Sequence, residues 1–473
     1  MQQNSQEPVQ SVRCSFEVRE LTQGVFDTIA AISTGNVVSG IGIIRISGGQ
    51  TLEILDRVFT PMRGVPMSRR EDRRLVLGKF FDTDGETLDI CLATISHGPN
   101  SYTGEDTAEL QCHGSPTVLA QGLKALFAAG ARQAKAGEFT RRAFLNGRMD
   151  LTQAEAVIDL IDAETAQAAK NAAGQLNGAI ARKTDVIYDS LTAICSHYHA
   201  VLDYPDEDIE DFELRAYEDT LRGAANSLER LLATSRRGSV MKNGVRAAII
   251  GRTNVGKSSL LNAILGYDRA IVTAIAGTTR DTVEEKAVVG GVLLRLMDTA
   301  GQRATADPVE KLGVERARDA ASAAELVIAV FDASEPLTSE DKAVLFEAKN
   351  APKHILVCNK SDLVPSLALE GALCVSALSG DGIGVLEKAV AALFPPDEAV
   401  PAGEVLTSPR QADAVSRALD YIRAALEAME TGIPPDAVLT EVEGALSALG
   451  ELTGRTVRED ITNGIFARFC VGK

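Results

Sequence analysis

A glycine-rich stretch near the middle of the chain, Gly251-Arg-Thr-Asn-Val-Gly-Lys257-Ser258-Ser259, restricts the folds that this sequence can adopt. It follows an apolar run at 245–250 that predicts a buried strand, and it leads into 259–265, which predict the start of a helix. This order is typical of a phosphate-binding P-loop, in which N–H groups at the helix N-terminus point at the anion. An ordinary glycine-rich turn is the alternative, and later motifs decide between the two.

A P-loop gives each polar residue of this stretch a task. We expect Lys257 to reach the β- and γ-phosphates and the Ser258 hydroxyl to bind Mg²⁺. The predicted nucleotide contacts here are Asn254, Val255, Gly256, Lys257, Ser258 and Ser259.

Two further motifs follow apolar strands downstream. Asp298-Thr-Ala-Gly301 ends the predicted strand 293–298, where a carboxylate can hold Mg²⁺ through water and the Gly301 N–H can meet the γ-phosphate. In Asn359-Lys-Ser-Asp362, the Asp362 carboxylate can accept hydrogen bonds from the N1–H and exocyclic amine of guanine, a donor pair that adenine lacks. Ser376-Ala377 fits the loop behind the guanine O6. The three ordered motifs predict a domain that selects GTP over ATP, with contacts from Asp298, Thr299, Ala300, Gly301, Asn359, Lys360, Asp362, Ser376 and Ala377.

Between the first two motifs lies a Gly- and Thr-rich segment, residues 273–281. We expect Thr279 to be the second hydroxyl ligand of Mg²⁺, closing over the γ-phosphate as a switch. A simple hairpin turn would explain the glycine but would leave the ion without this ligand. The expected nucleotide contacts are Thr273, Ala274, Ile275, Ala276, Gly277, Thr278 and Thr279.

Two residues are candidates for orienting the water that attacks GTP. Gln302 directly follows the Asp298–Gly301 motif, where Ras-type GTPases carry their water-positioning glutamine, and Glu310 lies a few residues later. No arginine finger can be assigned from the sequence. Because such a positive charge is worth roughly 10³–10⁵ in kcat, another group must supply it.

The composition excludes several classes of protein. The chain has 473 residues, enough for about three domains, and its formal net charge of −17 argues against a generally basic nucleic-acid coat. Its 7 cysteines are scattered without a C-x-x-C pair, which favours free thiols in a reducing compartment. No apolar run approaches the ~20 residues of a membrane span. We therefore expect a cytoplasmic protein, with residues 1–26 as a flexible extension.

The hydrophobic pattern predicts a multidomain α/β protein. Residues 27–146 read as an α+β domain, with strands at 42–48, 74–81, 88–96 and 108–112 and helices at 52–58 and 116–129. Residues 147–243 are expected to form the first part of a helical domain. Within them, 151–236 predict two or three long helices, interrupted by an acidic run at 203–211 that is interpreted as a solvated loop or, alternatively, a metal site.

Residues 244–397 alternate strand and helix, which indicates a doubly wound, Ras-like P-loop domain. The strands are expected at 245–250, 293–298, 325–331, 353–359 and 372–375, and the helices at 259–265, 313–322, 340–350 and 383–394. Residues 398–473 return to a helical pattern at 409–430, 436–450 and 456–469. This order suggests one helical domain interrupted by an inserted one; two separate helical pieces are the alternative.

Several segments make the chain similar to the tRNA modification GTPase family known as MnmE or TrmE, from about Asp27 to Lys473. Besides the GTP-binding motifs with Asn254, they are Gly42-Ile-Ile-Arg-Ile-Ser-Gly48, Gly98-Pro-Asn-Ser-Tyr-Thr-Gly-Glu-Asp106, Gly137-Glu-Phe-Thr-Arg-Arg-Ala-Phe-Leu-Asn146, Ile275-Ala-Gly-Thr-Thr-Arg-Asp281 and Phe469-Cys-Val-Gly-Lys473. One departure is Thr34-Gly-Asn-Val-Val-Ser-Gly40, where the family usually has Pro-Gly-Arg-Gly.

The resemblance implies that the N-terminal domain forms a homodimer and binds a formyl- or methylene-tetrahydrofolate one-carbon donor. The folate contacts then fall on Arg45, Glu109, Arg148 and Lys473. From the residues alone, each would be called a surface charge. Cys470 in the terminal motif invites a nucleophilic role, although a structural thiol is the alternative.

The resemblance also implies that the G domains dimerise with K⁺ bound, so that the ion supplies the missing positive charge. Asn254 would be its side-chain ligand, with Thr273, Ile275 and Thr278 completing the shell. Glu310 matches the family's catalytic glutamate and Arg280 its switch arginine, while Gln302 replaces a residue that is usually apolar.

Family members work with an FAD-dependent partner of the MnmG/GidA type and modify C5 of the wobble uridine in certain tRNAs. The partner carries the flavin, and no dinucleotide-binding signature is found in this chain. An RNA- or ribosome-binding GTPase of the Era or Der type is the rival interpretation. It would predict a basic KH-like module or a second G domain, and neither is evident in the sequence.

Overall fold

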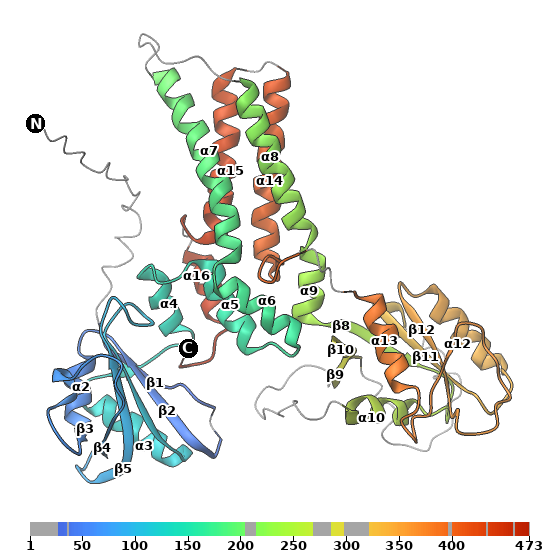
Figure 1. Cartoon of the computed structure of the whole chain (residues 1–473), viewed down its shortest axis with the longest axis horizontal. Coiled ribbons are helices and arrows are strands. Elements are labelled where there is room, and N and C mark those ends of the chain that lie inside the picture. The colour runs from blue at the N-terminus through green and yellow to red at the C-terminus, as the bar shows by residue number, and fades with distance from the viewer. Residues whose placement is uncertain are drawn as a thin grey trace, which may run out of the picture. The chain divides into compact units, whose positions relative to one another are not determined.

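The computed structural model describes residues 27–35, 37–203, 214–267, 285–297, 321–395, 400–431, 434–456 and 459–472 (Figure 1). These form two compact units. The first contains the described residues up to Ile158 and from Leu446 onward, and the second contains Asp159–Ala445. Over the described ranges, no helix combines the length and the apolarity that a bilayer crossing needs. The expected extension at 1–26 and most of the acidic run lie outside the described residues.

The first unit is built on a seven-stranded sheet in the order β3-β4-β5-β6-β2-β1-β7. Neighbouring strands are antiparallel except for β1 and β7, which are parallel. The strands are β1 (Ile29–Ile32), β2 (Ser39–Ser47), β3 (Phe59–Pro61), β4 (Val76–Phe81), β5 (Thr87–Ser96), β6 (Thr107–Gly114) and β7 (Arg132–Gln133).

The two faces of this sheet differ because successive side chains of a strand point in opposite directions. Ile44 and Ile46 are buried in a core with helices α2 (Thr51–Val58) and α3 (Pro116–Ala128). Arg45, between them, lies instead beside Phe139 on helix α4 (Glu138–Leu145). The predicted strands and helices of this region are confirmed, whereas β1, β3, β7 and α4 were not predicted.

The C-terminal segment returns to the first unit. Helix α16 (Glu459–Phe466) and Phe469 pack on Phe144 and Leu151. Beyond them, the Ser33 hydroxyl donates to the Gly472 carbonyl at 2.9 Å, and Val471 forms an isolated bridge with Ala136. The two ends of the described chain therefore belong to one folded body.

The described residues of 147–243 form five helices, whereas two or three long helices were predicted within 151–236, so the predicted number was wrong. They are α5 (Leu151–Ile161), α6 (Ala166–Leu176), α7 (Ala179–Asp203), α8 (Leu214–Ala233) and α9 (Ser235–Asn243). One break comes at Thr165, whose side chain caps α6 by accepting from the Ala168 N–H. Another comes at Gly178, where φ is 77°. The helical periodicity continues across both breaks and conceals them.

Helices from the two sides of the α/β segment pack together, as an interrupted helical domain requires (Figure 1). After the α/β segment come α14 (Pro409–Glu430) and α15 (Pro435–Thr453). α14 packs along α8, with ion pairs of 2.7 Å from Arg222 to Glu430 and from Arg423 to Glu229.

The chain enters and leaves the α/β segment at neighbouring points. α9 leads directly into the first strand of the α/β segment, β8 (Val245–Ile250). A Cβ atom at Gly238 on α9 would collide with the Leu406 carbonyl oxygen, which belongs to the exit segment. The Leu406 N–H donates to the Thr234 hydroxyl at 3.0 Å, just before α9. Glycine is required at position 238 because the exit segment lies against it.

The α/β segment contains a six-stranded sheet in the order β13-β12-β11-β8-β10-β9. All neighbouring strands are parallel except β9 and β10. The strands are β8 (Val245–Ile250), β9 (Glu285–Val289), β10 (Val292–Leu296), β11 (Leu326–Asp332), β12 (His354–Asn359) and β13 (Leu373–Cys374); the helices are α10 (Lys257–Tyr267), α12 (Ser339–Asn350) and α13 (Ile383–Leu393). This confirms the doubly wound fold. β9 was not predicted, and most of the helix expected at 313–322 lies outside the described residues.

Candidate functional site

The loop between β8 and α10 has the backbone shape that its glycines allow. Gly256 has φ of 94°, and a Cβ atom there would collide with the Asn359 side-chain amide. Asn254 also has a positive φ of 65°, a left-handed conformation that asparagine tolerates better than most residues. Its side chain is exposed at the loop surface.

Lys257 lies at the start of α10 and folds back over the loop. Its ammonium donates to the carbonyl oxygens of Gly251 at 2.8 Å and Arg252 at 2.6 Å. Burial lowers the pKa of this lysine. An anion at the helix N-terminus would give the ammonium a charged partner in place of two carbonyl dipoles.

Asn359 connects the P-loop to the loop that is expected to read the base. Its amide donates to the Val255 carbonyl at 2.9 Å, and its carbonyl accepts from the Ala377 N–H at 3.0 Å. The side chain is buried. The structure therefore brings together three loops, the first of which is 104 residues before the second and the second 18 residues before the third. They meet because β8, β12 and β13 are parallel and end at one edge of the sheet.

Asp362 is exposed and accepts a hydrogen bond from the Ser376 hydroxyl at 2.6 Å. This contact holds the carboxylate at the same edge of the sheet as the P-loop. The residues predicted to read guanine are thus neighbours in space.

Asp332, at the end of β11, was missed by sequence reasoning. It forms a 2.6 Å ion pair with Lys360, which has φ of 64°. Burial acts to raise the pKa of Asp332, but hydrogen bonds from Lys360 and Ser334 outweigh it, and the pKa is lowered. Its position at the carboxyl end of a predicted strand was the available signal.

Other predicted residues of this site lie outside the described residues. They are the nucleotide and metal contacts Thr273, Ala274, Ile275, Ala276, Gly277, Thr278, Thr279, Asp298, Thr299, Ala300 and Gly301, and the catalytic candidates Arg280, Gln302 and Glu310.

Two of the predicted folate contacts, Arg45 and Glu109, pair with each other. They face each other in the register of β2 and β6, and two guanidinium nitrogens of Arg45 donate to one carboxylate oxygen at 3.0 and 2.9 Å. The guanidinium carbon also lies 5.4 Å from the ring centre of Tyr102 and 5.7 Å from that of Phe139. Both side chains keep some exposure, 19% for Arg45 and 29% for Glu109, so a ligand can reach the pair.

Arg148 follows α4 and is exposed, with its aliphatic part beside Gly104 in the loop that carries Tyr102. Lys473 lies outside the described residues, although its neighbour Gly472 is held by Ser33. Cys470 is an exposed free thiol.

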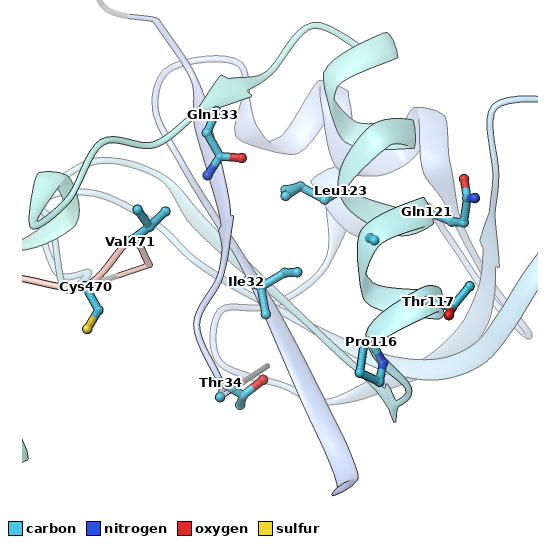
Figure 2. A pocket seen from close by; sticks show the side chains of 11 residues that line it. Ile32, Thr34, Pro116, Thr117, Gln121, Leu123, Gln133, Cys470 and Val471 are labelled. Atoms are coloured by element: carbon cyan, nitrogen blue, oxygen red, sulfur yellow. The ribbon is translucent and has the colours of Figure 1, made fainter. Parts of the chain in front are cut away.

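A cavity of about 770 Å³ adjoins the C-terminal segment and is lined by β1, α3 and β7. Figure 2 shows Ile32 and Leu123 facing it, with Gln133 and Val471 at its side. Ile32 and Leu123 pack on the α2–α3 core, whereas Arg45 lies beside α4. The cavity therefore belongs to the opposite face of the sheet from the Arg45–Glu109 pair.

Comparison with known proteins shows matches along nearly the whole chain. Residues 28–148 match the model of the GTP-binding protein TrmE N-terminus, and residues 151–470 match that of the MnmE helical domain. The tRNA modification GTPase MnmE of Symbiobacterium thermophilum is 42% identical over 459 residues, covering 94% of this chain and 99% of that protein. The protein of the same name from Chloroflexus aurantiacus is 43% identical over 457 residues, covering 94% and 100%. The solved G domain of the T. maritima FeoB iron transporter is 22% identical, with a TM-score of 0.24, and covers 32% of this chain and 99% of that one.

Proposed function

Since the chain belongs to the MnmE family of tRNA modification GTPases, we propose that it hydrolyses GTP and takes part in tRNA modification. The observation that carries the GTPase proposal is the position of Asn359, which hydrogen-bonds both Val255 in the P-loop and Ala377 behind the expected base. The residues proposed to bind phosphate and those proposed to read the base therefore lie together.

The described residues fit a Mg·GTP ligand. The α10 N-terminus offers backbone N–H groups. Lys257, the first residue of the helix, offers a half-buried ammonium, and the exposed Ser258 follows it. Ser258, with Thr279, would hold Mg²⁺, which neutralises phosphate charge during phosphoryl transfer. Asp362 would select guanine because its carboxylate accepts from two neighbouring donors of that base.

We propose that K⁺ binds next to the phosphates through Asn254, with Thr273, Ile275 and Thr278 as further ligands. The support from the described residues is that Asn254 is an exposed polar side chain on the P-loop, held there by a left-handed backbone. A cation at this point would stabilise the negative charge of the transition state as an arginine finger does.

The test compares GTP turnover in KCl and in NaCl. Because Asn254 has a positive φ, Asn254→Ala would add backbone strain to the loss of the side chain, whereas Asn254→Gly removes the side chain without that strain. We expect Asn254→Gly to lose most of the K⁺ stimulation and the exposed neighbour Thr253→Ala to keep it. Equal wild-type rates in the two salts would sink the K⁺ mechanism.

Glu310 is our proposed catalytic group for orienting the attacking water, and Gln302 is its competitor; Arg280 is a further catalytic candidate of the switch segment. Separate replacements by alanine distinguish them under saturating GTP. Full turnover in Glu310→Ala with a loss in Gln302→Ala would transfer the role to Gln302.

We also propose that Arg45, Glu109, Arg148 and Lys473 bind a formyl- or methylene-tetrahydrofolate. The Arg45–Glu109 pair supports this because it is half-buried, flanked by aromatic rings and still open to solvent. Arginine suits the glutamate carboxylate of the ligand, and Glu109 can accept from pterin N–H groups.

The folate test uses the full chain, because the first unit includes the C-terminal residues. Titration calorimetry with 5-formyl-tetrahydrofolate should give weaker binding for Arg45→Lys and Glu109→Gln than for wild type. The exposed Arg57→Lys on α2 is the matched control. Absence of binding by the wild-type protein would remove the folate proposal.

Finally, we propose that the chain works as a homodimer with an FAD-dependent partner of the MnmG/GidA type on the wobble uridine. Mass spectrometry of tRNA nucleosides, with and without both proteins, tests this. A modified uridine that forms without this chain would contradict it.

A further inference from the structure

Four side chains with metal-binding groups come together on β5 and β6, which are neighbouring antiparallel strands. Asp89 and Cys91 lie on β5, and Cys112 and His113 lie on β6. One ligand atom each of Asp89, Cys91 and Cys112 lies within 4.8 Å of the other two. The cluster shares no residue with the nucleotide site or with the Arg45–Glu109 pair.

The four side chains differ in their exposure to solvent, and the cluster is open on one side only. Cys91 and Cys112 are 4% and 2% exposed, and the Asp89 side chain is 8% exposed. His113, in contrast, is 77% exposed. The two thiols therefore lie at the buried end of the cluster, as part of the α2–α3 core, and the His113 imidazole faces solvent.

The Asp89 carboxylate is held in place from the side of His113. One of its oxygens contacts the His113 ring Nδ1 at 2.8 Å, and the other accepts from the His113 backbone N–H at 2.9 Å. Among the ion pairs of the described residues, Asp89 has no lysine or arginine partner. A carboxylate this buried is costly without a cation to balance it.

Two sulfur donors and a carboxylate are a ligand set that suits a thiophilic divalent ion rather than Mg²⁺ or Ca²⁺. Zn²⁺ takes four ligands, with Zn–S near 2.3 Å and Zn–O near 2.0–2.2 Å, so small side-chain rotations would bring these donors into range. We propose that Asp89, Cys91 and Cys112 bind one Zn²⁺ ion, with water from the solvent side as the fourth ligand.

His113 is then a positioning residue rather than a ligand. Its ring orients the Asp89 carboxylate by a hydrogen bond, an arrangement of outer residues that is common around protein metal sites. Loss of such an outer partner typically lowers metal affinity roughly 10–100-fold.

The experiment uses the full-length wild-type protein, stripped of metal and titrated with Co²⁺ and then Zn²⁺. We expect one Co²⁺ per chain, with a thiolate-to-cobalt charge-transfer absorption that Zn²⁺ abolishes. X-ray absorption of the Zn²⁺ form should show two sulfur and two oxygen or nitrogen ligands. Both measurements use the wild-type protein, so their outcome does not depend on whether a variant folds.

Variants then assign the ligands. Cys91→Ser and Cys112→Ser should each weaken the charge-transfer band, because one of two thiolate ligands is lost, and the double variant should lose the band. His113→Ala should weaken binding about tenfold while keeping the band. Cys358→Ser, a buried cysteine of the α/β core, is the matched control and should bind as wild type does. A zinc shell with only oxygen and nitrogen ligands, or a band that keeps its full intensity in the double variant, would overturn the proposal.

Discussion

Replacing Asn359 should damage the nucleotide site more than replacing Asp362, although Asp362 is the residue expected to read guanine. Asn359 is 2% exposed, and both ends of its amide are used, one by the Val255 carbonyl and one by the Ala377 N–H. In Asn359→Ala both backbone groups lose their partner inside the protein. The P-loop and the base-reading loop also lose the side chain that joins them.

The loss of stability in Asn359→Ala can be estimated from the two backbone groups that lose their hydrogen bond, the Val255 carbonyl and the Ala377 N–H. A buried donor or acceptor left without a partner costs about 1–3 kcal/mol. Two of them therefore predict a loss of about 2–6 kcal/mol, a large part of the ~5–15 kcal/mol that stabilises an average domain. Asp362 is exposed and receives a single hydrogen bond from Ser376, so Asp362→Ala should change stability by only about 0.5 kcal/mol.

The assay combines urea unfolding, followed by circular dichroism because the chain has no tryptophan, with binding of fluorescent GDP and ADP. We expect Asn359→Ala to unfold at lower urea concentration and to bind both nucleotides poorly. Asp362→Ala should keep the stability of the wild type and lose its preference for GDP. An Asn359→Ala protein that unfolds at the same urea concentration as the wild type and loses only its base preference would contradict this prediction.

Three further perturbations test other parts of the structure. Gly238→Ala should destabilise the helical domain, because its Cβ would meet the Leu406 carbonyl, whereas Gly223→Ala in α8, with open space around it, should stabilise it by about 0.5–1 kcal/mol in urea unfolding. Glu138→Gln should lower the free energy of unfolding by about 2 kcal/mol at pH 7. Burial acts to raise the pKa of Glu138, but hydrogen bonds from Arg132 and Lys135 and the nearby arginine charges outweigh it, so the pKa is lowered from 4.5. This contribution is complete above the unfolded pKa and is lost as pH falls through the lowered folded value, so the two proteins should converge at acid pH. Removal of Mg²⁺ with EDTA should abolish GTP turnover, and a rate unchanged in EDTA would argue against a Mg·GTP substrate.

The local pattern was sufficient to predict most elements of the fold. The apolar run before Gly251 and the helix after it lie where the sequence placed them, and α14 begins at Pro409 as expected. Each of these rests on signals within a few residues, such as an apolar run or a proline at the first helical position. β9 was missed because it is a short edge strand that includes Glu285 and Lys286, and polar residues of that kind weaken the strand signal.

Residues for the nucleotide site could be proposed from the sequence, but the contacts between them could not. The motif containing Asn359 indicated a nucleotide contact, whereas its bond to Val255 joins residues 104 positions apart and appears only when the strands are assembled. Arg45 and Glu109 were proposed as separate contacts, and their pairing depends on the register of β2 and β6. Long-range pairing of this kind leaves no trace in local spacing. The switch and catalytic residues stay predictions.

The contact between Gly238 and Leu406 determines the entropic cost of inserting the α/β segment into the helical domain. In an ordinary long loop, closing the ends costs entropy that grows by about 0.6 kcal/mol with each doubling of length. Here the helical domain holds both ends of the segment together by its own contacts, and the segment between them folds on itself. The α/β segment is thus an insertion whose two ends join the helical domain at neighbouring residues. The inserted segment can therefore become longer or shorter, or be replaced by another, during evolution without a change in the packing of the helices.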